Sequence, residues 1–421
     1  MPGPLQGIRI LDLSRVLAAP WCVQNLGDLG ADVIKIERPD CGDESRHWGP
    51  PWLADADGTP TRESAYFLSA NRNKRSVAID ISKPEGQRLI HRLAGQSDIC
   101  VENFKVGDLA RYGLDYASLS KINPRLIYCS ITGFGQDGPC AKQPGYDYLF
   151  QGMAGLMSVT GERDELPGGG PQRFGLPIVD LFTGMYATVS ILAALHHRDT
   201  SAEGQHVDVS LFGAALAMSS GVLSNYFNSG KVPKRTGNAS PNITPYGVYP
   251  CFDGQMIVAS ANQPQFEALC GALGKPEWKS DQRFRDNASR MEHQEELHAL
   301  FSAVLRTRPR TDWEEIFSKV GVPAGPINNY AQAIAHPQAK HLGSKLELPH
   351  TLGVMAAGVA NPMRFSATPV EYRRAPPLLG EHTREVLVER LGLTAAELVR
   401  LEAERVITCA AQAAPPRAGE G

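Results

Sequence analysis

Short apolar runs rich in β-branched residues alternate with a helical spacing of apolar residues over the first third of the chain. The runs predict strands at residues 8–13, 31–39, 76–81, 98–103 and 125–132. The helical patterns lie at residues 19–30, about 84–94 and 114–122. Because strands alternate with helices, we expect an α/β fold with a parallel sheet that helices cover on both faces.

The residues that follow each strand are the first candidates for a binding site, because open α/β sheets bind ligands beyond the carboxyl ends of their strands. These segments are Ser14 to Ala18, Arg38, Asn103 to Lys105 and Gly133 to Asp147. Basic side chains recur on or near them, at Arg38, Lys74, Arg75, Lys105, Arg111 and Lys142. Their placement favours an anionic ligand that carries phosphate, and a solvated rim of surface charge is the alternative interpretation.

The pattern changes after about residue 225. Residues 225–330 combine turn residues, strand-like pieces and amphipathic helices, which predicts a smaller α+β domain. Prolines interrupt residues 349–383, so we expect an irregular returning segment there instead of a compact unit. A helix at 383–405 and a solvated tail complete the chain.

Residues 174–195 form a largely apolar stretch that predicts a buried helix, yet Asp180 lies near its start. Burying a bare carboxylate is costly unless the group is paired, hydrogen-bonded or protonated. One interpretation is structural, because Pro177 suits the first turn of a helix and aspartate is favoured at the cap or in that turn. The alternative is a carboxylate nucleophile that forms covalent acyl or phosphoryl intermediates. The residues alone favour the cap.

Arg46 and Trp48 lie close together in the segment after the second predicted strand. An arginine can hold a carboxylate through two parallel hydrogen bonds, so Arg46 is a candidate substrate ligand. Trp48 is a candidate wall of the same pocket, and packing in the core is an equally good interpretation of its large apolar side chain.

The segment GFGQDG at residues 133–138 matches the glycine pattern of dinucleotide-binding turns. In such turns the third glycine lies in a helix whose N-terminus faces the pyrophosphate, but here Pro139 and a further loop follow. We interpret the segment as a loop that lets the backbone approach a ligand, and a NAD-dependent oxidoreductase is the alternative. The chain has no GxSxG or HExxH motif, and the pair His196–His197 suits the end of a helix better than a metal site.

Composition adds limits on size, partners and compartment. The chain has 421 residues, more than one compact core usually holds, so two domains are expected. The net charge of −3 gives no reason to expect nucleic acid. Eight cysteines are scattered singly without CxxC spacing, which favours reduced thiols over disulfides or zinc. Without a signal-peptide pattern, and with apolar runs broken by polar residues, we expect a soluble cytoplasmic protein without membrane association.

Blocks along nearly the whole chain, from Leu5 to about Val406, resemble the class III CoA-transferases, also called the formyl-CoA transferase or CaiB/BaiF family. They include LSRVLAAP, LGDLGADVIKIERP, NRNKRSVAIDI, VENFKVGDLARYGLDY, YCSITGFGQDGP, GYDYLFQGMAGLM, VDLFTGMYATVSILAAL, GVPAGPINN and PPLLGEHT. So many blocks in the family's order are a strong signal, unlike any one of them. Within the family the chain looks most like the succinate–hydroxymethylglutarate CoA-transferase branch, which moves CoA between dicarboxylic acids.

The resemblance implies a homodimer of two interlocked rings, in which a Rossmann-like large domain uses both ends of the chain. On this basis we expect a large CoA-binding domain at residues 1–200, which residues 385–408 complete. The other expected parts are a linker helix at 201–224, the small α+β domain at 225–330, a return linker at 331–384 and a flexible tail at 409–421.

The resemblance also makes Asp180 the catalytic residue. In the family scheme this carboxylate attacks the thioester of the donor acyl-CoA and gives a mixed anhydride and CoA thiolate. The thiolate then attacks the aspartyl carbonyl, and the acceptor carboxylate attacks the resulting aspartyl-CoA thioester. Because one thioester is exchanged for another, the scheme needs neither ATP nor a metal. CoA and acyl-CoA are substrates, and no tightly bound cofactor is implied.

Except for Ile79 and Ser82, the CoA contacts of the family fall on positions that the strand-end argument already marks. They are Leu17, Ala18, Arg38, Ile79, Ser82, Asn103, Phe104, Lys105, Arg111, Lys142, Tyr146 and Asp147. Two positions depart from the family pattern. Formyl-CoA transferases carry a glycine-rich loop over the active site, where residues 237–246 here are GNASPNITPY. Ser82 stands where some relatives have lysine, so Lys83 is expected to take that role.

The α-methylacyl-CoA racemases of the same superfamily resemble the chain and keep the aspartate, but they place a histidine where Tyr146 stands here. Proton transfer at the α-carbon needs two poised acid/base groups, and tyrosine is a poor replacement. We therefore expect an enzyme that moves CoA from an acyl-CoA, in the first place succinyl-CoA, to a small dicarboxylate or hydroxy-dicarboxylate. A 2-methylacyl-CoA racemase is the alternative, and the sequence leaves the acceptor acid open.

Overall fold

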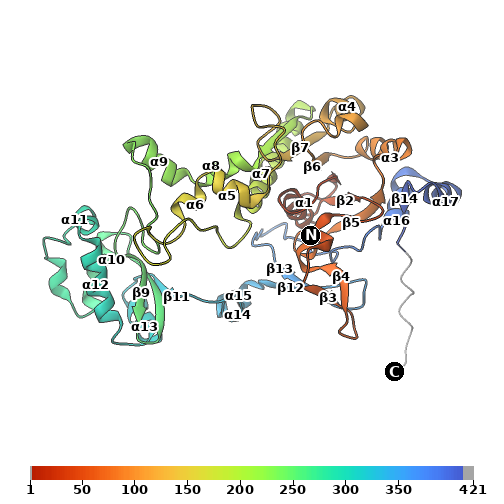
Figure 1. Ribbon diagram of the computed structural model, residues 1–421. Helices are drawn as coiled ribbons and strands as arrows, with labels where there is room; N and C mark the ends of the chain where they lie inside the picture. Colours follow the sequence, from red (N-terminus) through yellow and green to blue (C-terminus); the bar gives the residue numbers. More distant parts are fainter. Residues whose placement is uncertain (1, 411–421) are drawn as a thin grey trace, which may run out of the picture. The chain divides into compact units, whose positions relative to one another are not determined.

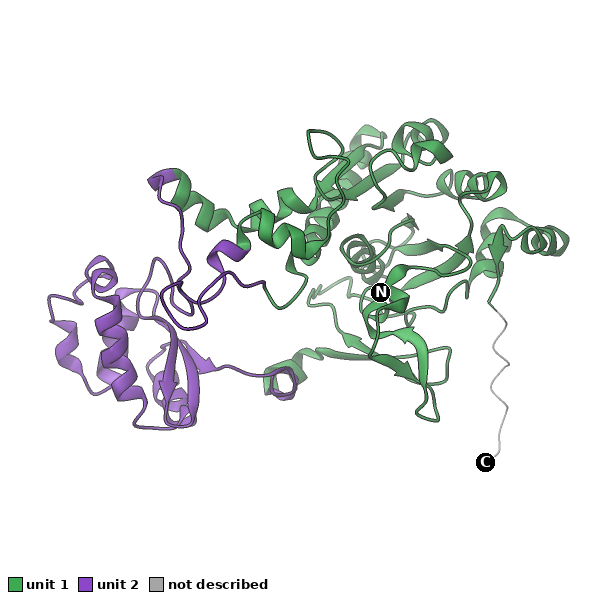
Figure 2. Cartoon of the chain, in the orientation of Figure 1, with its two compact units in different colours: residues 1–156, 174–227, 337–421 green, residues 157–173, 228–336 purple. Residues whose placement is uncertain are grey.

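The computed structural model describes residues 2–410, and the chain divides into two compact units (Figure 2). Unit 1 comprises Met1–Leu156, Phe174–Phe227 and Pro337–Gly421, and unit 2 comprises Met157–Arg173 and Asn228–His336. Unit 1 is therefore assembled from three separate stretches of chain. Most of the tail expected at 409–421 lies outside the described residues.

Unit 1 is built on a seven-stranded sheet with the order β14-β5-β2-β1-β6-β7-β8 (Figure 1). Its strands are β1 (Arg9–Asp12), β2 (Asp32–Glu37), β5 (Lys74–Ile79), β6 (Ile99–Glu102), β7 (Ile127–Thr132), β8 (His206–Ser210) and β14 (Ile407–Thr408). Every pair is parallel except β14 and β5, which are antiparallel. The predicted α/β class with a parallel sheet is thus confirmed, and each of the predicted runs overlaps one of its strands.

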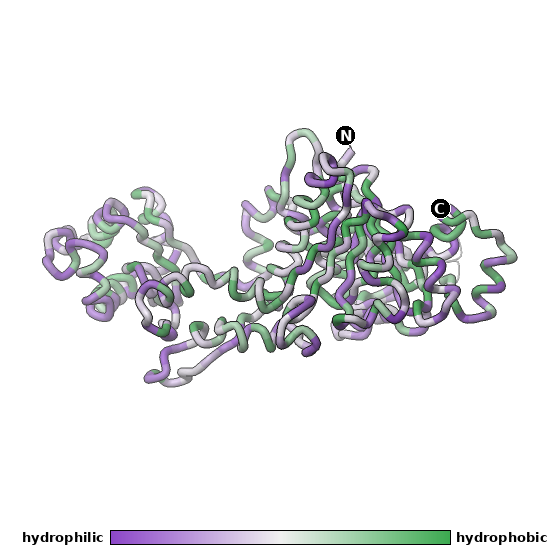
Figure 3. Tube along the Cα trace, turned by 90° about the horizontal axis from the view of Figure 1, so that it is seen from above, coloured by the Kyte–Doolittle hydropathy of each residue, from purple (hydrophilic) through white to green (hydrophobic). Residues whose placement is uncertain are grey.

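Alternate residues along the strands enter two separate hydrophobic cores, one on each face of the sheet. On one face, Ile99 and Val101 of β6 pack with α1 (Ala18–Asp28) and α7 (Ile178–Ser201). On the other, Cys100 packs in a core shared by α3 (Pro84–Ala94), α4 (Tyr116–Ile122), α16 (Thr383–Leu391) and α17 (Ala395–Ala403). Figure 3 shows hydrophobic segments gathered in the middle of this unit. Helices therefore cover both faces, as predicted.

Helix α7 is the one helix in the described part of the chain that is long and apolar enough to span a membrane. The expectation that polar residues break every apolar run too early is wrong for this helix, although core helices of globular proteins pass the same test. Val179, Ala187 and Ile191 are buried in the core that α7 shares with α1. The two helices approach closely at Gly184, where a Cβ would lie 2.6 Å from the carbonyl oxygen of Ala18. The contacts of α7 are therefore those of a core helix.

Two strands of the sheet are absent from the sequence-based prediction. The linker helix expected at residues 201–224 is wrong, because this segment contributes β8 to the edge of the sheet before α8 (Leu211–Met218) begins. Val207 and Val209 pack on the core between more exposed polar residues, the alternation of a strand with one buried face. The short strand β14 pairs with β5 next to the C-terminal helices.

Unit 2 contains an antiparallel sheet with the order β11-β10-β9, formed by β9 (Tyr246–Cys251), β10 (Gly254–Ala259) and β11 (Ala324–Pro326). Its main helices are α10 (Gln263–Ala272), α11 (Asn287–Glu292), α12 (Gln294–Leu305) and α13 (Arg310–Lys319). An aromatic core that includes Phe266, Phe301, Trp313 and Phe317 joins the sheet to the helices. This unit therefore has a hydrophobic core of its own.

The remaining elements connect these layers. They are β3 (Trp52–Ala54), β4 (Pro60–Ser64), α2 (Ala65–Leu68), α5 (Asp147–Met153), α6 (Leu156–Val159), α9 (Ser220–Ser229), α14 (Tyr330–Ala335), α15 (Pro337–Leu342), β12 (Lys345–Pro349) and β13 (Met355–Val359). Short 3-10 turns are η1 (Glu44–His47), η2 (Ala110–Tyr112) and η3 (Pro276–Lys279). The proline-rich return segment is thus irregular only after the β12–β13 hairpin.

Candidate active site

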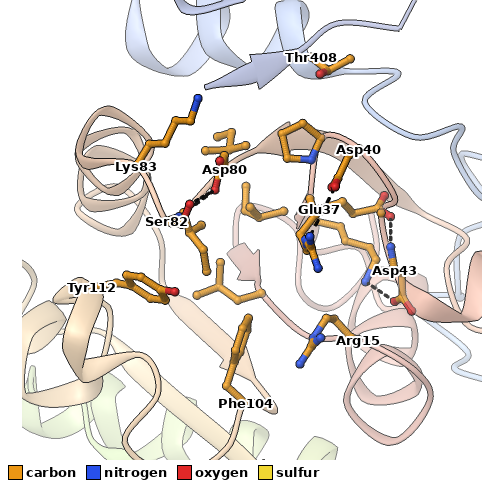
Figure 4. Close-up of a pocket in the computed structure, with 18 of the residues that line it drawn as sticks. Arg15, Glu37, Asp40, Asp43, Asp80, Ser82, Lys83, Phe104, Tyr112 and Thr408 are labelled. Atoms are coloured by element: carbon orange, nitrogen blue, oxygen red, sulfur yellow. Dashed lines mark hydrogen bonds and ion pairs between the residues drawn. The ribbon is translucent and has the colours of Figure 1, made fainter. Parts of the chain in front are cut away.

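A cavity of about 860 Å³ lies at the carboxyl ends of β1, β2, β5 and β6, which are neighbours in the sheet (Figure 4). This is the edge at which open α/β sheets bind their ligands. The walls come mainly from the loops after these strands and include Arg15, Arg38, Asp40, Asp43, Asp80, Ser82, Lys83, Phe104, Arg111, Tyr112 and Thr408. The volume lies within the range of roughly 300–1,000 Å³ that is typical of small-molecule sites.

The structure brings only part of the predicted CoA contacts to this cavity. Its lining includes Arg38, Ile79, Ser82, Phe104 and Arg111. The other predicted contacts lie outside its walls, and they are Leu17, Ala18, Asn103, Lys105, Lys142, Tyr146 and Asp147. Among these, Leu17 and Ala18 are buried at the start of α1, Lys105 lines a second cavity of about 330 Å³, and Lys142 and Tyr146 are exposed.

Cationic groups surround the cavity and remain accessible. The guanidinium of Arg38 is exposed and lies 3.4 Å from Asp40, and such exposed pairs are weak. The Lys83 side chain reaches the carbonyl oxygen of Glu404. Ser82 donates to Asp80 through its backbone N–H at 2.9 Å and its hydroxyl at 2.6 Å, so that hydroxyl is already engaged within the protein (Figure 4). The exposed cations that line the cavity suit the phosphate groups of an anionic ligand.

Two carboxylates meet at the start of α7. Asp147 accepts hydrogen bonds from the backbone N–H groups of Val179 at 2.7 Å and Asp180 at 3.2 Å. Its second oxygen accepts a hydrogen bond of 2.6 Å from Nε2 of Gln151. Asp147 therefore satisfies two of the backbone N–H groups that the first turn of this helix leaves unpaired. Asp180 is therefore not the cap, although it lies in the first turn, which the structural interpretation also allows.

The carboxylate of Asp180 makes no hydrogen bond to the protein within the described residues, although it lies in the first turn of α7. Burial, followed by the negative charge of Asp147, raises the pKa of Asp180 to about 7. Such a strongly raised pKa is more typical of a reactive carboxyl group than of a structural one. Asp180 is thus a partly desolvated carboxylate without a structural partner.

An aromatic pair lies beside these carboxylates. Burial, and then the charges of Asp180 and Asp147, raise the pKa of Tyr66 to about 12. Trp48 packs edge-on against Tyr66 with ring centroids 5.1 Å apart, and it is 42% exposed. The core-packing interpretation of Trp48 is therefore wrong, because nearly half of the side chain faces solvent. Its exposed ring is available as a wall.

Arg46 is not available to a substrate. Its Nε and Nη2 donate to the two carboxylate oxygens of Glu37, each at 2.8 Å. Its Nη1 donates to Glu63 at 3.0 Å, and Nη2 also donates to the carbonyl oxygen of Pro377 at 3.0 Å. The buried guanidinium lies 3.7 Å above the centre of the Phe67 ring. The expectation that Arg46 holds a substrate carboxylate is wrong, because protein groups occupy its donors.

The glycine motif forms part of a loop. Residues 133–146 connect β7 to α5 without a helix that begins at the third glycine. Gly135 and Gly138 have φ of 99° and 84°, a conformation that residues with a side chain rarely adopt. The loop interpretation is confirmed, and the oxidoreductase alternative loses the motif on which it depended. No group of three or more His, Cys, Asp or Glu side chains in the described part of the chain is placed to hold a metal ion.

A model of the family described as CoA-transferase family III matches residues 5–383. The chain belongs to this family. It is 46% identical over 386 residues to succinate–glutarate CoA-transferase of Agrobacterium fabrum, which covers 92% of this chain and 95% of the relative. The human succinyl-CoA:glutarate CoA-transferase is 40% identical to this chain over 390 residues. The match covers 92% of this chain and 86% of the human protein. The crystal structure of a CaiB/BaiF family protein from Brucella suis has a TM-score of 0.81 and 43% identity, and the match covers 93% of this chain and 100% of that one.

Two residues near Asp180 in this family III CoA-transferase are not among the sequence-based candidates. Tyr66 lies in the short helix α2, and nothing in its local apolar pattern indicates that it lies near Asp180. Gln151 follows Asp147 by one helical turn, a spacing that places both side chains on one face of α5. That spacing was the available signal. Asp147 itself was selected as a CoA contact, whereas its carboxylate binds α7.

Replacing Arg46 by alanine should lower the free energy of unfolding by about 3–5 kcal/mol, because Glu37 and Glu63 lose the partner of a buried ion pair. Denaturant unfolding of the purified enzyme measures the change. Arg38→Ala is the control, since its exposed ion pair should contribute only about 0–1 kcal/mol. Equal stability of the two variants, with a raised KM for the acceptor in Arg46→Ala alone, would contradict the structural role of Arg46.

Proposed function

We propose that this CoA-transferase moves CoA from an acyl-CoA, succinyl-CoA in the first place, to a small dicarboxylate or hydroxy-dicarboxylate. The Agrobacterium and human relatives are named for transfer between succinate or succinyl-CoA and glutarate, which makes glutarate the first acceptor to test. The observation that carries the proposal is the partly buried Asp180 carboxylate, which has a raised pKa and leaves the capping of α7 to Asp147.

The reaction is proposed to begin when the ionised carboxylate of Asp180 attacks the thioester carbonyl. The C–S bond breaks, CoA leaves as the thiolate, and a mixed anhydride joins Asp180 to the acyl group. The thiolate then attacks the aspartyl carbonyl and releases the donor acid as its carboxylate. These two steps leave CoA bound to Asp180 as a thioester.

The second half repeats these steps with the acceptor. Its carboxylate attacks the aspartyl thioester, which releases CoA thiolate and forms a new anhydride. The thiolate attacks the acceptor acyl carbon, so that the new acyl-CoA forms and Asp180 returns to its carboxylate. No electron or net proton is transferred. Because water would hydrolyse each anhydride, the partial desolvation of Asp180 supports this scheme.

The cavity is proposed to bind the phosphate-bearing part of CoA. Arg38, Ser82, Phe104 and Arg111 line it, and exposed guanidinium groups are suited to phosphate. Leu17 and Ala18 at the start of α1 are proposed to contact the thioester end. The remaining proposed contacts are Ile79, Asn103, Lys105, Lys142 and Tyr146, with Trp48 as a wall of the acyl site. For Asp147 we propose a positioning role, since its carboxylate is bound to α7.

The active enzyme is proposed to be a homodimer. Phe182, Met185, Tyr186 and Val189 form an exposed apolar stripe on α7 with the spacing of one helix face. Apolar side chains of the adjacent helix α5 are also exposed. Contiguous apolar surface of this kind is typical of protein interfaces, and a second copy of the chain would cover it.

The finer features of the resemblance are part of the same proposal. Unit 1 would be the Rossmann-like CoA-binding domain of an interlocked dimer, and unit 2 would contain the small domain expected at 225–330. We further propose that the enzyme acts in the cytoplasm, with CoA thioesters as substrates and without a tightly bound cofactor. Helix α7, the one described helix that is long and apolar enough to span a membrane, has its buried face in the core of unit 1, which supports this proposal.

No observation favours the racemase alternative. Tyr146, which stands where racemases place a histidine, is 69% exposed, and tyrosine is a poor replacement for that acid/base group. Deuterium exchange at the α-carbon of a 2-methylacyl-CoA, without acceptor-dependent transfer, would establish the racemase instead.

Asp180→Asn should abolish transfer from succinyl-CoA to glutarate, with a loss of about 10⁴-fold or more in kcat, because the amide cannot form the anhydride. The folded structure should persist, since Asp147 caps α7 without the Asp180 side chain. A coupled assay of acyl-CoA formation and a melting curve measure both effects. Asp199→Asn, an exposed change at the far end of α7, is the matched control. Transfer by Asp180→Asn at the control's rate would exclude the nucleophile.

Asp147→Asn should shift the acid limb of kcat/KM to lower pH. In the wild type, activity should rise with pH through about 7, because the reactive form is the ionised carboxylate and its pKa is raised to about 7. Removing the negative charge of Asp147 removes one cause of that shift and therefore lowers the pKa of Asp180. Burial remains, so the pKa stays above the usual value of an aspartate. Asparagine still accepts the two backbone hydrogen bonds. A limb that stays in place, as expected for Asp199→Asn, would contradict the electrostatic coupling.

A further inference from the structure

Val16 adopts a left-handed backbone conformation, with φ of 73°. This is unusual, because a β-branched side chain clashes with its own backbone in that region. The other non-glycine residues with positive φ in the described part of the chain, Asn73, Ala202 and Arg405, are not β-branched. Val16 lies in the turn between β1 and α1, directly before Leu17 and Ala18. Such a conformation persists only where the surrounding structure holds it.

A buried ion pair holds this turn from both sides. The backbone N–H of Val16 donates to the carboxylate of Asp43, at 3.1 and 3.3 Å from its two oxygens. Nζ of Lys35 lies 3.0 Å from Asp43 and donates to the carbonyl oxygen of Ser14 at 2.7 Å. Asp43 is 1% exposed and Lys35 is fully buried. The pair therefore binds the residue before Arg15 and the residue after it.

The same turn is fixed at its centre. The side chain of Asn103 accepts a hydrogen bond from the backbone N–H of Arg15 at 2.9 Å and donates to its carbonyl oxygen at 2.7 Å. The Arg15 guanidinium lies 4.7 Å above the centre of the Phe104 ring, and both side chains line the cavity (Figure 4). The conformation at Val16 thus sets both the direction of Arg15 and the start of α1.

The electrostatics of Asp43 agree with a permanently charged anchor. Burial alone would raise the pKa of Asp43, but Lys35 and the hydrogen bonds from Ser45 outweigh it and lower the pKa to about 2. Buried ion pairs are often no more stabilising than apolar residues of similar size. A contribution to stability therefore explains poorly why this ion pair is present. A role in fixing the shape of the cavity wall explains it better.

We propose that Asp43, supported by Lys35, is a positioning residue that keeps Val16 left-handed, so that the turn from Ser14 to Ala18 has the shape that binds acyl-CoA. The inference rests on the proposed function, because Leu17 and Ala18 are CoA contacts only in that function. Asp43 acts through the backbone of the turn, and the side chain does not touch the reacting atoms.

A cycle of Asp43→Asn and Val16→Gly tests the proposal, with kcat and KM measured for succinyl-CoA and for glutarate. Glycine adopts positive φ without a steric clash, so Val16→Gly reduces the need for the anchor. Asp43→Asn should raise the KM for succinyl-CoA about tenfold when Val16 is present, and less than about threefold in the Val16→Gly background. The KM for glutarate should change less than about twofold in both.

Ala202→Gly is the matched control. Ala202 is also left-handed, with φ of 62°, but it is exposed at the C-cap of α7 and does not line the cavity. It should leave the effect of Asp43→Asn unchanged. An equal effect of Asp43→Asn with and without Val16→Gly would overturn the positioning role, and so would a folded Asp43→Asn enzyme with the wild-type KM.

Asp43→Asn also leaves the charge of Lys35 buried without its carboxylate, which can prevent folding. In that case Lys35→Met is added to remove the unpaired charge, and the melting temperature is the readout. Val16→Gly should raise the melting temperature more in the Asp43→Asn, Lys35→Met background than in the wild type, whereas Ala202→Gly should raise it equally in both. Equal increments from Val16→Gly in the two backgrounds would overturn the proposal. Transfer by the wild type is measured first, since its absence counts against the proposed function, whereas the melting-temperature cycle still decides the role of Asp43.

Discussion

Asp147 binds the backbone N–H groups at the start of α7, and this contact decides the role of the neighbouring carboxylate. If Asp180 had to cap the helix, its oxygens would be occupied by backbone donors. Because Asp147 accepts from those donors, Asp180 stays partly buried without a hydrogen-bond partner in the described protein, and its pKa rises to about 7. The proposed chemistry depends on this difference between two carboxylates at one helix end.

The parallel sheet supplies the rest of the site. Loops that follow four neighbouring strands line one cavity, and buried ion pairs in its wall hold two of these loops. Arg46 binds Glu37, and Lys35 binds Asp43. Since these groups are almost inaccessible, they act on the shape of the loops. The exposed cations at the rim, such as Arg38, are the ones that a ligand can reach.

Periodicity located the central strands because each is a run of buried apolar residues. It missed β8, in which exposed polar residues alternate with apolar residues that face the core. Asp180 was visible as a charge in an apolar helix. Its role was not, because the competing carboxylate comes from Asp147, far earlier in the chain. Arg46 was misassigned for the same reason, since its partners include the carbonyl of Pro377 in the return segment. Local patterns indicate which residues are unusual, whereas tertiary contacts decide what occupies their hydrogen-bonding groups.

The most direct measurement of the central claim is mass spectrometry of the peptide that contains Asp180. The enzyme is incubated with succinyl-CoA without an acceptor, denatured in acid and digested. The account predicts CoA in thioester linkage to Asp180 itself, and no such adduct when free CoA replaces succinyl-CoA. An adduct on a different side chain, or turnover under conditions in which the Asp180 peptide is never modified, would contradict it.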